Sequence, residues 1–309
     1  MDESNHSQQR KIGLAYGVLA FSAWGVLPLY WKLLEQIPAG QILAHRIVWS
    51  FFFVAAILAM GKKWLIFKEV LTSPKKVALI ALCSVIISVN WFTYIYAVNT
   101  HQVVEASLGY YINPLVSVIF GLAFLKEKLS QAQWVAVLMA AIGVVVMTVQ
   151  YGKIPLIAMT LAISFAIYGL LKKLIKVDSV ASLALETAVL VPIALLYLGY
   201  KQIAGVGAIG VIPGSILLLL IASGVATAAP LLWFAKGAQR IELSTIGFLQ
   251  YLAPTISLGI GIFIFNEPFS KTHLISFGFI WIAIIVYTLS KTGIFKDKDR
   301  SYQSKEATL

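Results

Sequence analysis

The sequence predicts an all-α integral membrane protein whose ten transmembrane helices form two five-helix repeats of opposite topology. Three observations lead to this fold class. The composition is too apolar for a soluble domain, the chain divides into ten apolar runs of membrane-spanning length, and one pattern occurs twice with different flanking charge. Together they leave little of the chain outside a bilayer.

Composition decides the broad class of protein. The 309 residues are 60% hydrophobic and 12% charged, with a mean hydropathy of +0.87, whereas charged residues make up about 25% of a typical soluble domain. The net charge of +11 comes from Lys and Arg scattered between apolar runs. They do not form the basic face that nucleic-acid binding requires. The sequence therefore predicts a membrane protein without a nucleic-acid partner.

Motifs for catalysis are absent from the sequence. No G-x-x-x-x-G-K-[ST] phosphate loop occurs, so we expect no ATP hydrolysis on this chain. The histidines are scattered, and Cys83 is the only cysteine, so neither a metal cluster nor a disulfide framework is expected. The sequence predicts a protein that is not an enzyme, with no catalytic residue, no metal site and no cofactor.

Ten apolar runs account for most of the chain. About twenty apolar residues cross the hydrocarbon core of a bilayer as a helix. Runs of about this length lie near 12–33, 41–60, 77–98, 104–125, 130–149, 154–174, 182–200, 213–235, 243–265 and 272–290. Short connections predict antiparallel neighbours. The segment 1–11 precedes the first span, and a basic tail at 291–309 follows the last.

Basic residues orient these spans. Lysines and arginines in short loops favour the cytoplasm. When the ten spans alternate in direction, five of the 24 Lys and Arg fall on one side of the membrane, and the others fall on the side of both termini. The five are Lys32, Arg46, Lys153, Lys201 and Lys271. We therefore expect both termini in the cytoplasm.

One pattern occurs twice along the chain. The stretch "YINPLVSVIFGLAFLKEKLS" from Tyr111 agrees at six of its twenty positions with "YLAPTISLGIGIFIFNEPFS" from Tyr251. Glu127 lies between two lysines in the first copy, whereas its equivalent Glu267 has none beside it. The lysines are lost because the second copy runs in the opposite direction across the membrane. The predicted repeats are 12–150 and 151–290, an arrangement that secondary transporters use to place a site at the bilayer midplane.

Polar side chains within apolar spans mark the bundle interior or a water-filled path, because they are costly in lipid. The predicted substrate contacts are Trp24, Asn90, Trp91, Tyr94, Tyr110, Asn113 and Gln250, and the predicted hinges are Pro114 and Pro254. An interhelical hydrogen bond is an equal alternative for Asn90, and a purely structural crossing is an alternative for the two proline-containing spans. The spans 130–149 and 272–290 have almost no interior polar atoms and are expected at the periphery.

Charged residues within spans form a second group of candidates. Arg46 with His45, and Glu186, lie about five residues into equivalent spans of the two repeats. Because the halves are inverted, we expect them near opposite membrane faces and not as a direct ion pair. Glu186 is too short to reach the interface and is a candidate proton-coupling or gating residue, whereas snorkelling is an alternative for Arg46.

Two further acids complete the coupling and gating candidates. Glu105 and Glu242 each open a span, at 104–125 and 243–265. An acid at that position also complements the positive end of a helix, which is the structural alternative for both.

Five stretches resemble a known family of transporters. They are "AHRIVWSFFF" (44–53), "NWFTYIYAVN" (90–99), "EASLGYYINPL" (105–115), "GFLQYLAPT" (247–255) and "FGFIWIAI" (277–284). Over residues 12–290 the chain resembles the RarD subgroup of the EamA-type transporters, within the drug/metabolite transporter superfamily. The resemblance implies a ten-helix inverted repeat with a central cavity built by the first four spans of each half. It also implies permeation of drugs or metabolites, and the subgroup's name refers to chloramphenicol sensitivity.

These observations predict a secondary-active permease or exporter of a small organic metabolite or drug, working by alternating access in the cell (inner) membrane. The expected partners are a small-molecule substrate, the lipid bilayer, and protons or an exchanged solute for coupling. A homodimer through the two peripheral spans is compatible with the sequence. A membrane-embedded enzyme, a non-transporting scaffold and a lipid-carrier flippase remain alternative functions.

Overall fold

The computed structural model describes residues 3–291 except 63, 100–102, 153–154, 176, 211 and 265–270. This part of the chain is helical and contains no strand. The helices are α1 (Glu3–Lys32), α2 (Ala39–Met60), α3 (Trp64–Leu71), α4 (Pro74–Asn99), α5 (Val103–Leu125), α6 (Gln131–Tyr151), α7 (Leu156–Leu174), α8 (Ser179–Ile203), α9 (Gly214–Ala238), α10 (Leu243–Gln250), α11 (Leu252–Phe263) and α12 (Lys271–Lys291). Ten segments are long and apolar enough to cross a membrane, with α10 and α11 together forming one of them. The predicted all-α fold with ten spans is confirmed.

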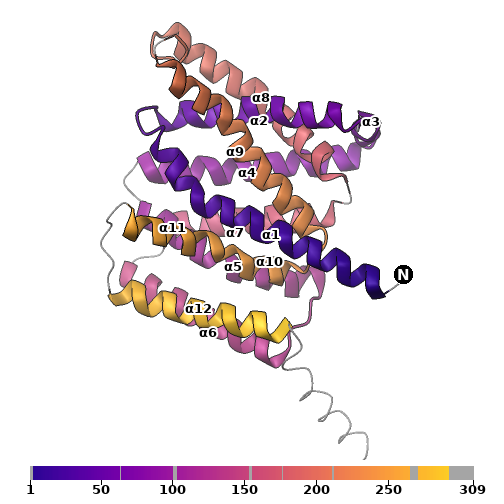
Figure 1. Cartoon of the computed structure of the whole chain (residues 1–309), viewed down its shortest axis with the longest axis vertical. Coiled ribbons are helices and arrows are strands. Elements are labelled where there is room, and N and C mark those ends of the chain that lie inside the picture. The colour runs from indigo at the N-terminus through magenta and orange to yellow at the C-terminus, as the bar shows by residue number, and fades with distance from the viewer. Residues whose placement is uncertain are drawn as a thin grey trace, which may run out of the picture.

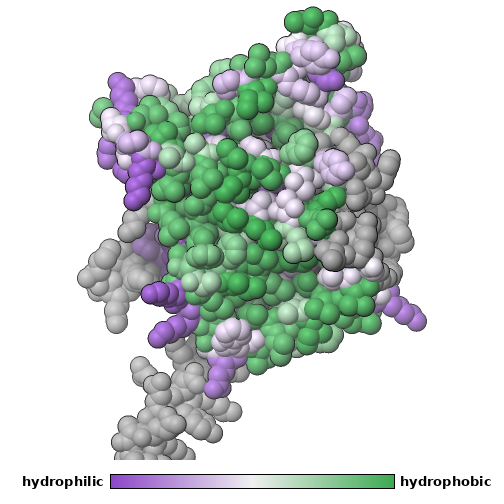
Figure 2. All heavy atoms as spheres, turned by 180° about the vertical axis from the view of Figure 1, so that it is seen from behind, coloured by the Kyte–Doolittle hydropathy of each residue, from purple (hydrophilic) through white to green (hydrophobic). Residues whose placement is uncertain are grey.

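Successive spans cross the bundle in alternating directions, so α1 begins and α12 ends at the same face. We call it the terminal face and its opposite the distal face. In Figure 1 the helices run across the picture, and the N-terminus marks the terminal face on the right. Figure 2 shows a hydrophobic surface across the middle of the molecule and hydrophilic residues at its two sides. This distribution matches a bilayer with its hydrocarbon around the middle of the helices.

Packing between the halves follows the order of an inverted repeat. Three helices contact their own repeat equivalents: α2 packs against α8, α5 against α10, and α6 against α12. α1 contacts α9 and α11, and its equivalent α7 contacts α4 and α5. Exchanging the two halves therefore reproduces these contacts.

α6 and α12 lie together at one edge of the bundle, at the bottom of Figure 1. A close backbone approach joins them, because a Cβ atom at Gly143 would lie 2.7 Å from the carbonyl oxygen of Ser276. Small residues permit such approaches between membrane helices. The position of the pair agrees with the peripheral place expected for spans 130–149 and 272–290.

The structure differs from the sequence-based expectation in three places. α1 begins at Glu3, within the segment 1–11 that was expected to precede the first span. The basic connection after α2 contains the short helix α3, where the rings of Trp64 and Phe67 stack 5.3 Å apart. The ninth span divides at Tyr251, because Pro254 lacks the N–H group that would bond to the carbonyl of Gln250.

Candidate functional site

Arg46 on α2 lies among side chains from three other helices. Its guanidinium carbon is 4.5 Å from the ring centroid of Trp31 on α1 and 5.7 Å from that of Trp91 on α4. Its Nε atom donates a hydrogen bond of 2.9 Å to Oγ1 of Thr227 on α9. The cation is therefore held by aromatic rings and a hydroxyl group, with no carboxylate among these contacts.

Two tyrosines extend this group. The rings of Tyr94 on α4 and Tyr110 on α5 meet edge to face, with centroids 6.1 Å apart. Both lie near Arg46, and they keep 37% and 47% of their surface exposed. We call Arg46, Trp31, Trp91, Tyr94, Tyr110 and Thr227 the Arg46 cluster. It unites four predicted site residues with Trp31 and Thr227, which were not among the predicted contacts.

The asparagine of α4 is bonded to α7. Nδ2 of Asn90 donates hydrogen bonds of 2.9 Å both to the carbonyl oxygen of Leu161 and to Oγ of Ser164. The structure thus shows the interhelical hydrogen bond that was the alternative for Asn90. Its contact with substrate stays a prediction.

A second polar chain joins α7, α5 and α10 inside the bundle. Nδ2 of Asn113 donates to the carbonyl oxygen of Ala162 at 3.2 Å, and Oδ1 of Asn113 accepts from Oγ of Ser117 at 3.3 Å. Nε2 of Gln250 then donates to Oγ of Ser117 at 3.1 Å. Asn113, Ser117 and Gln250 are all buried. The two halves of the chain are therefore connected by polar contacts in an apolar interior.

Trp24 lies apart from both groups, in the aromatic core. Its ring centroid is 5.3 Å from that of Phe21 and 5.8 Å from those of Phe165 and Phe234. These contacts give Trp24 a packing role, and its contact with substrate stays a prediction. The two predicted hinges differ: α5 runs unbroken through Pro114, whereas the division between α10 and α11 lies one turn before Pro254.

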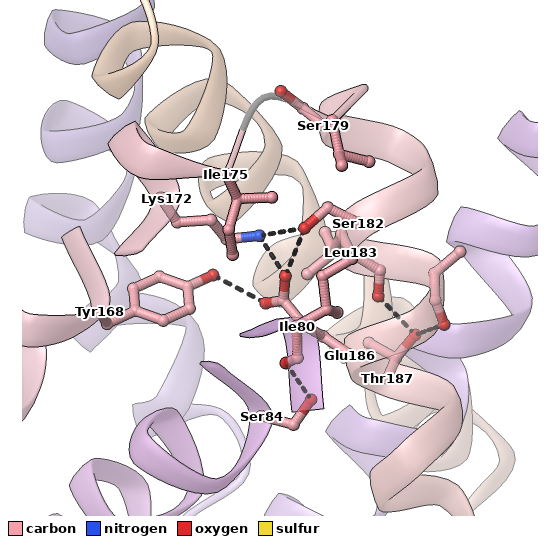
Figure 3. A network of polar contacts seen from close by, with 12 residues as sticks. Ile80, Ser84, Tyr168, Lys172, Ile175, Ser179, Ser182, Leu183, Glu186 and Thr187 are labelled. Carbon is pink, nitrogen blue, oxygen red and sulfur yellow. Dashed lines mark hydrogen bonds and ion pairs between the residues drawn. The ribbon is translucent and has the colours of Figure 1, made fainter. Parts of the chain in front are cut away.

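Glu186 on α8 lies in a buried polar network with α7 (Figure 3). Its Oε1 atom forms an ion pair with Nζ of Lys172 and accepts a hydrogen bond of 2.8 Å from Oγ of Ser182. Its Oε2 atom accepts from the hydroxyl of Tyr168 at 3.1 Å. The side chains of Lys172 and Glu186 are only 2% and 3% exposed. We call Glu186, Lys172, Ser182 and Tyr168 the Glu186 network.

Local sequence spacing builds this network. Tyr168 and Lys172 are four residues apart on α7, and Ser182 and Glu186 are four residues apart on α8, so each pair projects from one face of its helix. The start of α8 is fixed by Asp178, whose carboxylate accepts from two backbone N–H groups of the first turn. The two polar faces therefore meet across a short connection.

Lys172 differs from the other basic residues that were counted at the side of the termini. It lies at the end of the predicted span 154–174, and the structure shows it buried and pointing into the bundle. The signal that identifies it is its spacing from Tyr168, which sets it on the face of α7 turned toward α8. Arg46 and Glu186 belong to separate groups, as expected from the inverted halves.

The remaining coupling candidates lie in different surroundings. His45 is buried; its Nδ1 atom accepts from Nε1 of Trp49 at 3.3 Å, and its Nε2 atom has no partner among the described residues. Oε2 of Glu242 accepts from Oγ1 of Thr245 at 3.0 Å. The side chain of Glu105 lies outside the described part of the structure. Coupling roles for all three stay predictions.

Glu127 forms a contact between the halves that the sequence did not reveal. It follows α5, and its two carboxylate oxygens accept hydrogen bonds from the backbone N–H groups of Leu243 at 2.6 Å and Ser244 at 3.0 Å. These groups open α10, where an acceptor is needed. Nearby, Lys173 donates to the carbonyl oxygen of Ile241. The repeated glutamate of the sequence pattern is the signal for this link, while its equivalent Glu267 lies outside the described residues.

A hollow of about 330 Å³ lies on a different part of the molecule, between α11 and α12. It is lined by Thr255, Leu258, Gly259, Ile262, Phe263, Leu274 and Trp281. None of the candidate site residues lines it, and its apolar walls suit a lipid chain better than a polar solute.

Comparison with known proteins gives a single family. The model of the EamA-like transporter family matches residues 11–149 and again residues 152–289. A protein of Bacillus subtilis named "Uncharacterized transporter YojE" is 50% identical over 292 residues, which is 93% of this chain and 96% of that protein. "Protein RarD" of Escherichia coli is 39% identical over 92% of this chain and 96% of its own length.

More distant likenesses agree with this result. "Chloramphenicol-sensitive protein RarD" of Pseudomonas aeruginosa is 25% identical over 89% of this chain and 92% of that protein. A solved structure titled "Crystal structure of protein" superposes with a TM-score of 0.69 at 22% identity, covering 90% of this chain and 97% of that one. At that identity the superposition concerns the fold alone.

Proposed function

The chain belongs to the EamA-like transporter family, and from this premise we propose that it is a secondary-active transporter of a small organic metabolite or drug. It would act by alternating access in the cell (inner) membrane and without catalysis. The observation that supports this most is the polar chain of Asn113, Ser117 and Gln250, which joins α5 to α10 within the apolar bundle. Inverted-repeat transporters bind their substrates where the two halves meet.

The proposed path is lined by residues of both repeats. Asn90, Trp91, Tyr94, Tyr110, Asn113 and Gln250 would contact substrate, and Pro114 and Pro254 would let α5 and α11 bend as the halves rock. This assignment is supported by the exposed tyrosine rings and by two amides that already bridge helices, half-buried at Asn90 and buried at Asn113. Amides whose hydrogen bonds can be exchanged between helix and solute suit a site that opens to each side in turn.

We propose that Glu186 couples transport to protons through its ion pair with Lys172. A proton added to the Glu186 carboxylate would neutralise it, break the ion pair and free the Lys172 ammonium group. The nearly complete burial of both side chains supports this role, because a change of charge there must be answered by movement of α7 and α8. An exchanged solute is the alternative source of coupling.

Counterflow in liposomes containing only this protein tests the proposed function. Vesicles preloaded with chloramphenicol, or with pools of small metabolites, should take up labelled solute in a saturable way. Chloramphenicol is included because one relative bears its name. The Glu186→Gln variant should keep this exchange and lose accumulation driven by a proton gradient.

Two outcomes would contradict these proposals separately. Absence of saturable flux for any pool would favour the scaffold, enzyme or flippase alternatives. Gradient-driven accumulation by folded Glu186→Gln would remove the coupling role. Should Glu186→Gln fail to fold, the double variant Glu186→Gln with Lys172→Met removes both charges and applies the same test.

We propose that the terminal face is cytoplasmic, because most basic residues fall on that side. Single cysteines replacing Lys68 on α3 and Gly214 at the start of α9 test this orientation. Both positions are exposed, and an added Cβ at Gly214 meets no other atom. A membrane-impermeant thiol reagent added to intact cells should label position 214 and not position 68; the reverse pattern would invert the topology.

A further inference from the structure

Arg46 is a charged group of the bundle interior that no described acid balances. Glu186 is paired with Lys172, whereas among the residues placed by the structure no carboxylate contacts Arg46. Arg46 and Glu186 are each the eighth residue of their helices, so each lies roughly 10 Å along α2 or α8. Ionisable side chains within membrane spans are costly and mark functional sites. A cation at this depth that no described acid balances therefore calls for an anion.

The guanidinium of Arg46 is positioned to receive that anion. It has five N–H donors in a planar fork. Nε is bonded to Thr227, and within the described part of the chain the two terminal amino groups have no acceptor. These amino groups are also accessible. Arg46 is only half-buried, and its amino groups, which have no described acceptor, are not fully buried. Packing against Trp31 and Trp91 fixes the group and leaves its donors free.

The surroundings restrict the chemistry of the anion. A bidentate arginine fits a carboxylate or a phosphate, but a phosphate monoester carries about two negative charges at pH 7. Arg46 carries one positive charge, and no second described cation contacts the cluster. The site therefore suits a ligand with a single negative charge. The rings of Trp31 and Trp91 lie against the guanidinium, and the paired rings of Tyr94 and Tyr110 belong to the same cluster. Aromatic faces bury flat apolar groups well.

We propose that the Arg46 cluster binds the carboxylate of a small monocarboxylic acid that has an aromatic or similarly flat apolar body. That this acid is also carried across the membrane rests on the proposed function; its binding does not. Arg46 then acts as a substrate ligand, which replaces the gating role expected from the sequence. The tryptophans hold the guanidinium, and the exposed tyrosines contact the body of the acid.

Binding to the full chain in lipid nanodiscs tests the proposal. The probes are phenylacetate and indole-3-acetate, each paired with its neutral amide, phenylacetamide and indole-3-acetamide. Quenching of tryptophan fluorescence reports phenylacetate, and microscale thermophoresis reports all four probes. The acids should bind at least about tenfold more tightly than their amides. A charge-assisted hydrogen bond contributes about 1.5 kcal/mol or more, which corresponds to at least a tenfold difference in affinity. Arg46→Gln should abolish this preference.

A matched control is available at the same distal end. Lys201 near the end of α8 lies 5.7 Å from the rings of both Tyr197 and Tyr200, so it too is a cation on aromatic rings. Lys201→Gln removes one positive charge without touching the Arg46 cluster and should bind the acids as the parent does. Arg46→Lys keeps the charge but lacks the fork, and should reduce the preference for acids several-fold. This variant keeps the test valid if Arg46→Gln does not fold.

Three results would overturn the proposal: equal affinity for acids and amides, unchanged acid binding by folded Arg46→Gln or Arg46→Lys, or no saturable binding of either acid. Counterflow separates this failure from that of the proposed function. A protein that exchanges a neutral solute but binds no acid is a transporter without this site. A protein that binds acids through Arg46 but exchanges nothing has the site without the transport function.

Discussion

The Arg46 cluster and the Glu186 network occupy equivalent places in the two repeats but differ in how their charges are neutralised and how far they are buried. Arg46 and Glu186 are the eighth residues of α2 and α8, which enter the bundle from opposite faces. Glu186 has an ion-pair partner and two hydroxyl donors, and its side chain is 3% exposed. Arg46 has aromatic rings and one hydroxyl, and remains half-buried.

This difference indicates how an inverted repeat can assign separate tasks to equivalent positions. Equal depth from opposite faces follows from the repeat, whereas the closure of each site depends on its neighbours. The buried pair of Glu186 and Lys172 joins two helices, and its charges neutralise each other within the protein. Arg46 is accessible and no described acid neutralises its charge, so an anion from outside the chain can do so. Variants that alter one site at a time test this difference through their free energies of unfolding.

The largest effect is expected at the Glu186 network. Glu186→Gln leaves the ammonium of Lys172 buried without its counter-charge, and breaking a buried pair in this way typically costs about 3–5 kcal/mol. The free energy of unfolding, measured in mixed detergent micelles titrated with denaturing detergent, should fall by that order. Adding Lys172→Met to Glu186→Gln should restore much of the loss, because both charges are then absent.

An exposed ion pair supplies the control for this prediction. Lys32 and Glu35 approach to 2.6 Å, but their side chains are 58% and 63% exposed. Exposed pairs contribute less than about 1 kcal/mol, so Glu35→Gln should hardly change the free energy of unfolding. Equal losses for Glu35→Gln and Glu186→Gln would show that burial does not distinguish the two pairs.

A smaller loss of stability is expected at the Arg46 cluster. Arg46→Gln removes contacts with two indole rings and one hydrogen bond to Thr227. Each ring contact contributes about 0.5–2 kcal/mol, and a hydrogen bond from a charged donor about 1.5–3 kcal/mol. The variant also removes the cost of keeping a cation inside the bundle, and no described counter-charge is left buried. The unfolding free energy should therefore fall by about 2 kcal/mol, which is less than for Glu186→Gln. A loss as large as that of Glu186→Gln would indicate a structural arginine and weaken the contrast between the sites.

Much of the fold could be predicted because hydropathy and charge act along the chain. Span length is set by the bilayer, so the ten helices follow from counting apolar runs of that length. The division of the ninth span was also within reach, since Pro254 removes a backbone donor one turn after Gln250. The amphipathic helix α3 was missed because it is too short for the length criterion.

Partners within the sites were harder to predict because they depend on contacts between distant segments. Trp31 is 15 residues from Arg46 in the sequence and Thr227 is 181 residues from it, so neither spacing nor hydropathy links them. Lys172 was counted only as a basic residue on the side of the termini, because charge counting ignores which face of a helix a side chain occupies. Tyr94 and Tyr110 were chosen as polar residues of neighbouring spans, and the structure does bring them together.

The link from Glu127 to α10 should contribute about as much as a helix cap. Its carboxylate satisfies the backbone N–H groups of Leu243 and Ser244, and loss of an N-terminal cap typically costs about 1 kcal/mol. Glu127→Ala should therefore lower the unfolding free energy by about that amount, and Glu127→Gln by less, because an amide oxygen still accepts. Amide hydrogen exchange at the start of α10 should rise in the alanine variant. Unchanged exchange there would contradict the capping role.

The smallest effect on stability is expected for Asn113→Ala. This variant removes hydrogen bonds to Ala162 and Ser117 but leaves Gln250 bonded to Ser117. Hydrogen bonds between membrane helices average about 0.6 kcal/mol, and Thr148→Ala, which breaks a bond within α6 alone, is the control for general destabilisation. Affinity for the transported solute should nevertheless fall in Asn113→Ala and not in Thr148→Ala, because only Asn113 of these two belongs to the polar chain that joins α5 to α10. If affinity is unchanged in folded Asn113→Ala, the polar chain of α5 and α10 is a structural joint, and substrate contact is left to the Arg46 cluster.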